Sequence, residues 1–199
     1  MSGLDLVLAS ASPRRRELLD QIGVRHICDP ADIDESLQPG EQPAAYVERL
    51  ARQKAACVAV RYPGNRHAVL AADTIVLVDD DPLGKPRDHF DGLAMLAKLS
   101  GRTHCVLTAV CLQHPGGIAC ELVETRVEFI PLTRELCERY LATDEPWDKA
   151  GAYAIQGLAG AFIRRIEGSY SNVVGLPLCE TWQLLCANGV TTPMALRNE

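Results

Sequence analysis

The sequence predicts an α/β fold with a central mixed β-sheet flanked by helices. Short apolar runs alternate with helical patterns over the first hundred residues, which is typical of parallel strands joined by crossover helices. Two strand-like segments, 105–113 and 118–129, flank His114-Pro115-Gly116-Gly117, which predicts a β-hairpin. The chain has 199 residues, 47% of them hydrophobic, enough to bury a core. We therefore expect parallel and antiparallel pairing in one sheet.

The first half of the chain alternates strands and helices. Apolar runs predict buried strands, and proline suits a first helical position because its missing N–H would have no partner there. The predicted strands are Leu4–Ala9 and Ala68–Val78, and the predicted helices are Pro13–Ile22 and Pro43–Val60. Residues 28–42 are acidic and turn-rich, which predicts a loop.

The second half contains the hairpin, three helices and several turns. Asp88 and Thr133 are expected N-caps of helices that run to Leu99 and Leu141. The remaining predicted elements are short β-like pieces at Gly151–Gln156 and Gly160–Ile166 and a last helix at Leu176–Ala187. We expect one domain over residues 1–190 and a loose tail over 191–199.

Composition narrows the class of protein. The formal net charge of −6 argues against a nucleic-acid-binding surface, which normally needs a basic face. The start of the chain has no signal-peptide pattern, and no stretch reaches the roughly 18 apolar residues of a membrane span. The eight cysteines form no Cys-x-x-Cys and no zinc-finger spacing. We expect reduced thiols and a cytoplasmic location.

The segment Ser10-Ala11-Ser12-Pro13-Arg14-Arg15-Arg16 predicts an anion site. It lies between a strand and a helix start, where free backbone N–H groups and the helix dipole attract negative charge. Ser12 can cap this helix, and arginines can grip phosphate oxygens in a forked geometry. The alternative is a solvated basic face, because three consecutive arginines are about 100° apart on a helix and cannot all face one ligand.

Three further charged side chains are candidates for chemistry. Asp73 interrupts the apolar run 69–78, where a carboxylate is costly unless it is paired or meets a metal. It could activate water or hold a cation, or it could be a structural ion pair. Lys85 stands between Gly84 and Pro86, which restrict the local backbone. Lys85 and Lys54, which lies on a predicted helix, are candidate phosphate ligands. The alternative for each is an ordinary surface lysine.

Two glycine-rich polar segments, 150–157 and 166–177, suit recognition of a nucleobase. The amide of Gln156 presents a donor and an acceptor, which can pair with the edge of a pyrimidine. The alternative is a pair of surface turns.

Together these residues resemble the Maf family of nucleoside triphosphate pyrophosphatases. The resemblance runs from about Leu4 to Leu185 and implies an elongated α/β fold with a cleft between two lobes. It also implies hydrolysis of a nucleoside triphosphate to the monophosphate and pyrophosphate with a divalent cation. The matching motifs, in chain order, are Ser10-Ala11-Ser12-Pro13-Arg14-Arg15, Ala72-Asp73-Thr74, Gly84-Lys85-Pro86, Ser100-Gly101-Arg102-Thr103-His104 and Tyr153-Ala154-Ile155-Gln156-Gly157.

The resemblance implies a role for each matching residue. Asp73 corresponds to the proton acceptor that activates water. The groups that line the triphosphate site correspond to Ser10, Arg15, Lys54 and Lys85. Three positions that distinguish substrate branches correspond to Arg14, Thr74 and Gln156, and their residue types match the branch that acts on dTTP and UTP.

The cation is expected to be Mg²⁺ or Mn²⁺, held by Asp73, and we hypothesise that Glu35 in the acidic loop is a second ligand. A solvated loop acid is the alternative for Glu35. The resemblance also suggests a homodimer. From the net charge and the lack of a long apolar stretch we expect no nucleic-acid or membrane partner.

Three other functions stay open. One is the same reaction on another base, such as 7-methyl-GTP or a modified pyrimidine, and the residue types of Arg14, Thr74 and Gln156 argue against 7-methyl-GTP. Another is a nucleotide-binding regulator without turnover, which would need the basic residues but no catalytic carboxylate. A nucleic-acid-binding module is disfavoured by the net charge and by only three Phe and two Trp for stacking.

Overall fold

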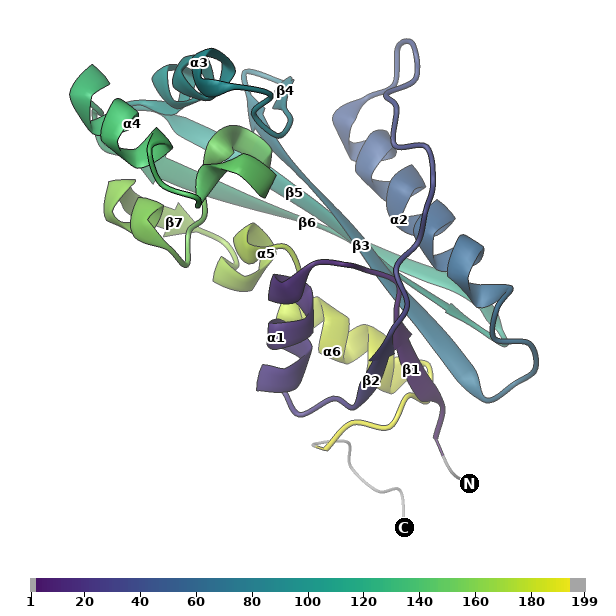
Figure 1. Cartoon of the computed structure of the whole chain (residues 1–199). Helices are drawn as coiled ribbons and strands as arrows, with labels where there is room; N and C mark the ends of the chain where they lie inside the picture. The colour runs from purple at the N-terminus through teal and green to yellow at the C-terminus, as the bar shows by residue number, and fades with distance from the viewer. Residues whose placement is uncertain (1–2, 194–199) are drawn as a thin grey trace. The chain divides into compact units, whose positions relative to one another are not determined.

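A computed structural model describes residues 3–193, and it confirms the mixed sheet flanked by helices (Figure 1). The strands in this range are β1 (Asp5–Leu8), β2 (His26–Cys28), β3 (His67–Val78), β4 (Asp81–Leu83), β5 (Thr103–His114), β6 (Gly117–Phe129) and β7 (Ile163–Glu167). They join in the order β2-β1-β3-β5-β6-β7, and β4 pairs with β3. The pairs β1–β2 and β1–β3 are parallel, whereas β3–β4 and β6–β7 are antiparallel.

The α-helices are α1 (Pro13–Gln21), α2 (Pro43–Ala59), α3 (His89–Leu99), α4 (Arg134–Leu141), α5 (Tyr170–Val174) and α6 (Leu178–Ala187). Three short 3₁₀ helices follow α4: η1 (Pro146–Asp148), η2 (Ala150–Ala152) and η3 (Leu158–Phe162). Two predicted caps are confirmed, since Asp88 accepts from the Asp91 N–H at 2.8 Å and Thr133 from the Leu136 N–H at 3.2 Å. Ser12 is the N-cap residue of α1, but its side chain makes no capping hydrogen bond.

The structure differs from the sequence prediction in short elements. The pattern missed β2, β4 and α5, each three to five residues long, because so short a run has no clear period. The prediction of a β-like piece over Gly151–Gln156 is wrong. Gly151 and Ala152 have φ of +71° and +58°, which is incompatible with a strand, and the backbone turns there.

The chain divides into two compact units. The first unit comprises residues 1–73, 108–123 and 175–199, as far as the structure describes them. Its core joins one face of two strands to α2. Val7 lies on β1 and Ala9 directly follows it, Val69 and Ala71 lie on β3, and Ala55 and Val58 lie on α2. Burial of these apolar side chains fixes α2 against β3.

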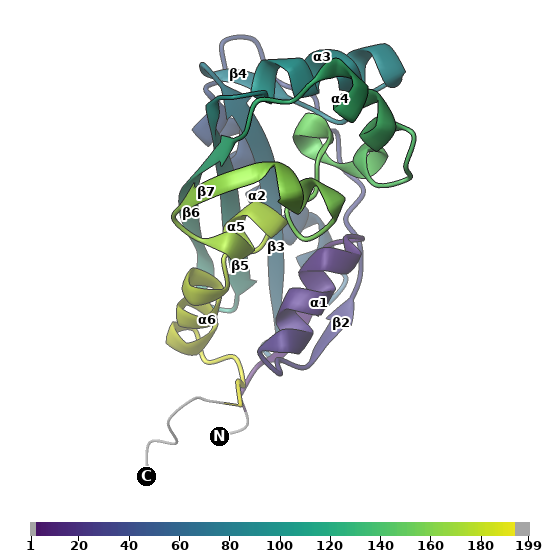
Figure 2. The same cartoon turned by 90° about the vertical axis from the view of Figure 1, so that its left-hand side faces the viewer.

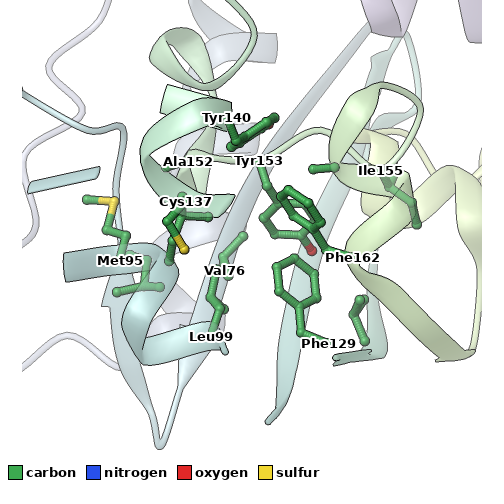
Figure 3. Packing of buried hydrophobic residues seen from close by; sticks show 14 of the residues in the cluster. Val76, Met95, Leu99, Phe129, Cys137, Tyr140, Ala152, Tyr153, Ile155 and Phe162 are labelled. Atoms are coloured by element: carbon green, nitrogen blue, oxygen red, sulfur yellow. The ribbon is translucent and has the colours of Figure 1, made fainter. Parts of the chain in front are cut away.

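The second unit comprises residues 74–107 and 124–174. Helices α3 and α4 lie side by side in it (Figures 1 and 2). Its core is rich in aromatic rings that meet edge to face, with Phe129 5.0 Å from Tyr153 and Tyr140 5.2 Å from Phe162 between ring centroids (Figure 3). This core surrounds the segment that leads to Gln156, because Ala152, Tyr153 and Ile155 are buried in it.

The expectation of reduced thiols is wrong for two cysteines. Cys111 on β5 and Cys120 on β6 form a disulfide, with their Cα atoms 4.1 Å apart. A two-residue connection between β5 and β6 places them opposite each other, as an antiparallel hairpin does. Motif spacing along the chain does not reveal such a cross-strand pair.

None of the helices within residues 3–193 combines the length and apolar character needed to cross a membrane. Of the tail predicted over 191–199, the last six residues lie outside the described range. In the described part, Thr192 is buried and its hydroxyl lies 3.4 Å from the Cys186 sulfur.

Burial of His104 generates a prediction about pH. His104 is 3% exposed, its Nε2 lies 2.8 Å from the Tyr153 hydroxyl, and burial lowers its pKa from 6.5 to about 4. Between these values the unfolded chain binds a proton that the folded chain does not, so the free energy of unfolding falls as pH falls through this window. The loss is about 3 kcal/mol by pH 4.

We expect His104→Gln to remove this part of the pH dependence. Urea unfolding from pH 7 to pH 4 measures it, and the same change at the exposed His89 is the control. An equally steep loss of stability in His104→Gln would contradict the prediction.

Candidate functional site

Strand alternation brings Asp73 to α2. Successive side chains of a strand point to opposite faces, so Asp73 shares a face with Val69 and Ala71, which pack against α2. Lys54 precedes Ala55 in that packed stretch of α2, so its ammonium can reach the carboxylate. The same alternation directs Thr74 to the other face of β3. The apolar core of the first unit therefore positions this ion pair.

Lys54 links two carboxylates. Its Nζ lies 2.6 Å from Asp73 Oδ1 and 2.6 Å from Glu35 Oε1. The side chains of Lys54 and Asp73 are only 11% and 12% exposed, whereas that of Glu35 is 55% exposed. Burial raises the pKa of the Asp73 carboxyl above its ordinary value, and the positive charges of Lys54 and Arg15 act in the opposite direction. Asp73 is thus a buried acid whose charge is partly compensated.

The acidic loop that carries Glu35 is tied to α2. The Tyr46 hydroxyl donates to the Glu35 carbonyl at 2.8 Å, and Arg49 donates to the Ser36 carbonyl at 3.0 Å. Arg49 also grips Glu41 through two bonds of 2.6 and 2.7 Å, a bidentate geometry that holds the guanidinium in place. These contacts keep Glu35 beside Lys54 although its side chain is exposed.

Arg15 and Ser10 lie together at the start of α1. Arg15 donates from Nη1 to Ser10 Oγ at 3.4 Å and from Nε to the Gly175 carbonyl at 2.8 Å. Burial lowers the pKa of Arg15, and the negative charge of Asp73 opposes that effect. A guanidinium beside a hydroxyl and a helix N-terminus provides donors for an anion. Arg14 follows Pro13 on the same first turn.

The second unit holds Lys85 and Gln156, and a backbone contact joins their segments. The Gly151 N–H donates to the Gly84 carbonyl at 3.0 Å. A Cβ on Gly151 would lie 3.1 Å from Val76 Cγ1, and its φ of +71° also favours glycine. Both Lys85 and Gln156 are exposed. The glycine therefore allows the segment before Lys85 and the segment before Gln156 to pair.

The predicted site residues thus fall into two groups. Asp73, Lys54, Glu35, Arg15 and Ser10 lie in the first unit and are connected by contacts or by charge. Arg14 also belongs to the first unit, and Thr74, Lys85 and Gln156 belong to the second.

Asp73 and Glu35 are the candidate ligands for a cation. Within residues 3–193 no cluster of three or more His, Cys, Asp or Glu side chains is arranged to hold a metal. Asp73 and Glu35 lie close to each other, but the point where they meet is filled by the Lys54 ammonium, so a cation would be held by the second oxygen of each carboxylate. Two carboxylates fit an Mg²⁺ or Mn²⁺ ion that takes its other oxygen ligands from water and substrate.

Sequence patterns missed three residues that support the site. Two of them are Tyr46 and Arg49, whose spacing of three residues places them on one helix face. The Arg49 guanidinium lies 5.5 Å from the centre of the Tyr46 ring. The third is Glu145, which accepts hydrogen bonds from Leu158 and Ala159 just after the Gln156-Gly157 pair.

Comparison with known proteins gives a consistent family. Residues 5–188 match Maf, described as Maf-like protein. A dTTP/UTP pyrophosphatase of Anaeromyxobacter sp. (strain Fw109-5) is 56% identical over 94% of this chain and 91% of the relative. Proteins of the same name from Methylobacillus flagellatus and Hahella chejuensis are 52% and 51% identical, over 94% and 93% of this chain and 94% and 92% of the relatives.

Among solved structures, the Staphylococcus aureus Ham1 protein has a TM-score of 0.48 at 14% identity, over 79% of this chain and 90% of that chain. A similarity of this size adds nothing to the family match.

The shared ammonium generates a stability prediction. Lys54→Met leaves a buried Asp73 carboxylate with one cation fewer, and breaking a buried pair in this way costs on the order of 3 kcal/mol. Chemical denaturation at neutral pH measures the loss. Arg52→Met is the matched control, because Arg52 lies on the same helix and pairs with the half-exposed Glu48, a contact worth less than about 1 kcal/mol. Equal losses in the two variants would contradict the role given to Lys54.

Proposed function

Because the chain belongs to the Maf family, we propose that it hydrolyses dTTP and UTP to the monophosphate and pyrophosphate. The protein is a nucleoside triphosphate pyrophosphatase, a hydrolase of phosphoric anhydride bonds. The observation that carries the proposal is the buried Asp73 carboxylate held against Lys54, in a chain whose relatives named dTTP/UTP pyrophosphatase are 51 to 56% identical.

Asp73 is the proposed general base. A water molecule attacks the α-phosphorus, its proton passes to the Asp73 carboxylate, and the bond from the α-phosphorus to the oxygen that bridges to the β-phosphorus breaks. A carboxylate with a raised pKa is a better base than an ordinary surface aspartate. The positive charges of Lys54 and Arg15 favour the ionised form of Asp73, which is the form that accepts the proton.

The basic residues serve the departing pyrophosphate. Arg15, with Ser10 and the start of α1, offers N–H and O–H donors to phosphate oxygens. Lys54 and Lys85 supply two more positive charges for the same purpose. Such donors favour the transition state because negative charge accumulates on the leaving group.

A divalent cation, Mg²⁺ or Mn²⁺, belongs to the proposal, with Asp73 and Glu35 as its protein ligands. When bound, the ion would neutralise phosphate charge and help to orient the attacking water. Two convergent carboxylates support this assignment.

Recognition of the base is assigned to Gln156, together with Arg14 and Thr74. An amide offers one acceptor and two donors, which suits the acceptor–donor edge of thymine and uracil. A base that leaves these groups unpaired would be bound less well. The exposure of Gln156 supports this role, because its amide is accessible to a ligand.

We propose that residues 1–190 form one catalytic domain, and the family match over residues 5–188 supports this. The homodimer stays a prediction.

The first test is pyrophosphate release from a panel of nucleoside triphosphates by wild type and Asp73→Asn. We expect release from dTTP and UTP, and a loss of at least about 10²-fold in the variant because an amide cannot accept the proton. Nucleotide binding by calorimetry should remain measurable.

Asp81→Asn is the control, because Asp81 pairs with Lys98 on an exposed surface. Wild-type binding of nucleotides without release from any of them would instead indicate a nucleotide-binding regulator.

Removal of the cation is the second test. We expect EDTA to stop pyrophosphate release and added Mg²⁺ or Mn²⁺ to restore it, because both proposed ligands are carboxylates. Glu35→Gln should raise the metal concentration needed for half-maximal rate. Unchanged turnover in EDTA would exclude the cation from the mechanism.

A further inference from the structure

The backbone around Gln156 is held at both of its ends. Residues Ala154 to Gly157 form a tight turn in which the Gly157 N–H donates to the Ala154 carbonyl at 3.1 Å. Gln156 occupies the third position of this turn. Before it, the Ile155 side chain is 8% exposed and belongs to the core of the second unit (Figure 3). The contacts before and after the turn therefore fix the backbone at Gln156 and, with it, the direction in which its side chain leaves the backbone.

The anchor after the turn is Glu145, which lies more than ten residues earlier in the sequence. Its Oε2 accepts from the Leu158 N–H at 2.7 Å, and its Oε1 accepts from the Ala159 N–H at 3.2 Å. These two N–H groups open the 3₁₀ helix η3 and have no intrahelical partner. The residue before η3 is Gly157, which has no side chain to cap it. Glu145 therefore supplies the cap from a distant segment.

The carboxylate is itself held in place. The Tyr140 hydroxyl donates to Glu145 Oε1 at 2.9 Å, and the Tyr140 ring packs against Phe162 at the other end of η3. The backbone carbonyl of Glu145 accepts from the Lys149 ammonium at 2.7 Å. A carboxylate with three donors on its two oxygens has a defined orientation, and bonds to a charged acceptor are stronger than neutral ones.

Gly157 has a specific role in this arrangement. A Cβ built on Gly157 would overlap both Glu145 oxygens, so that any other residue must displace the carboxylate. The pair Gln156-Gly157 thus combines a side chain available to a ligand with a position that only glycine can fill while Glu145 is in place.

We propose that Glu145 is a positioning residue for recognition of the nucleobase, acting through the turn that carries Gln156. The inference rests on the proposed function, because Gln156 can bind a nucleobase only if the substrate is a nucleoside triphosphate. Glu145 touches no reacting atom in this scheme. Its carboxylate keeps the Gln156 amide at one place and orientation, and a displacement of the order of 1 Å is enough to weaken specific contacts.

The test compares Glu145→Gln with wild type for pyrophosphate release from dTTP and dCTP. Gln keeps the size of the side chain, but its NH₂ group must face one of the three donors. We expect KM for dTTP to rise about tenfold with little change in kcat, and the preference for dTTP over dCTP in kcat/KM to fall about tenfold. Glu138→Gln is the matched control, since Glu138 pairs with Arg134 on the exposed side of α4, and it should leave both quantities unchanged.

A double-mutant cycle separates positioning from general damage. If Glu145 acts through Gln156, then Glu145→Gln should not reduce the preference further in a Gln156→Ala background. A preference lost in Gln156→Ala but retained in Glu145→Gln overturns the inference and leaves the proposed function intact. A preference retained in Gln156→Ala overturns the specificity role of Gln156, and the positioning role with it, while pyrophosphate release still reports the activity itself.

Gly157→Ala gives a second route if Glu145→Gln folds poorly. We expect it to lower the base preference as Glu145→Gln does, because the added methyl displaces the same carboxylate. Hydrogen exchange gives a readout that needs no substrate: the Leu158 and Ala159 amides should exchange at least about tenfold faster in both variants. Unchanged protection of these two amides would overturn the inference.

Discussion

The ion pair between the Lys54 ammonium and the Asp73 carboxylate is the interaction on which the proposed site in the first unit depends. A carboxylate in the middle of an apolar strand is costly, and an unpaired one would oppose folding of the core around it. Lys54 removes much of that cost because α2 packs on the face of β3 that carries Asp73. The apolar contacts of Ala55 and Val58 are therefore needed to hold the Lys54 ammonium beside Asp73. Without this packing, the same lysine would extend into solvent.

The pair also determines how a substrate could be received. Lys54 contacts Asp73 and Glu35 at equal distances, and the positive charge of Arg15 also acts on Asp73. The two carboxylates favour a cation, whereas Arg15 and the start of α1 favour an anion. A metal–nucleotide complex carries both kinds of charge. Opposite preferences close to each other in one unit therefore suit that ligand better than they suit either component alone.

Much of this site could be predicted from the sequence, because its main signals are violations of a local pattern. Asp73 stands out as a charge in an apolar run, and the residues from Ser10 to Arg16 combine a strand end with a helix start. The mixed sheet also follows from periodicity and one hairpin. Glu145 gives no such signal, because its partners are backbone N–H groups 13 and 14 residues away, which any residue type could supply. The disulfide depends on the exact register of the hairpin formed by β5 and β6, and η2 depends on positive φ angles at Gly151 and Ala152.

Different residues hold the proposed catalytic groups and the proposed base-recognition group in place, so substitutions in the two groups should have different effects. Asp73, Lys54 and Glu35 balance one another within the first unit, so a charge change at any of them affects stability as well as rate. Gln156 is exposed and its position is maintained by Glu145, Tyr140 and the aromatic core of the second unit. Replacement of Gln156 alone leaves every one of these anchors in place. We therefore expect a change at Gln156 to alter base preference at little cost in folding free energy, whereas loss of one member of the Asp73–Lys54 pair should lower both the rate and the stability.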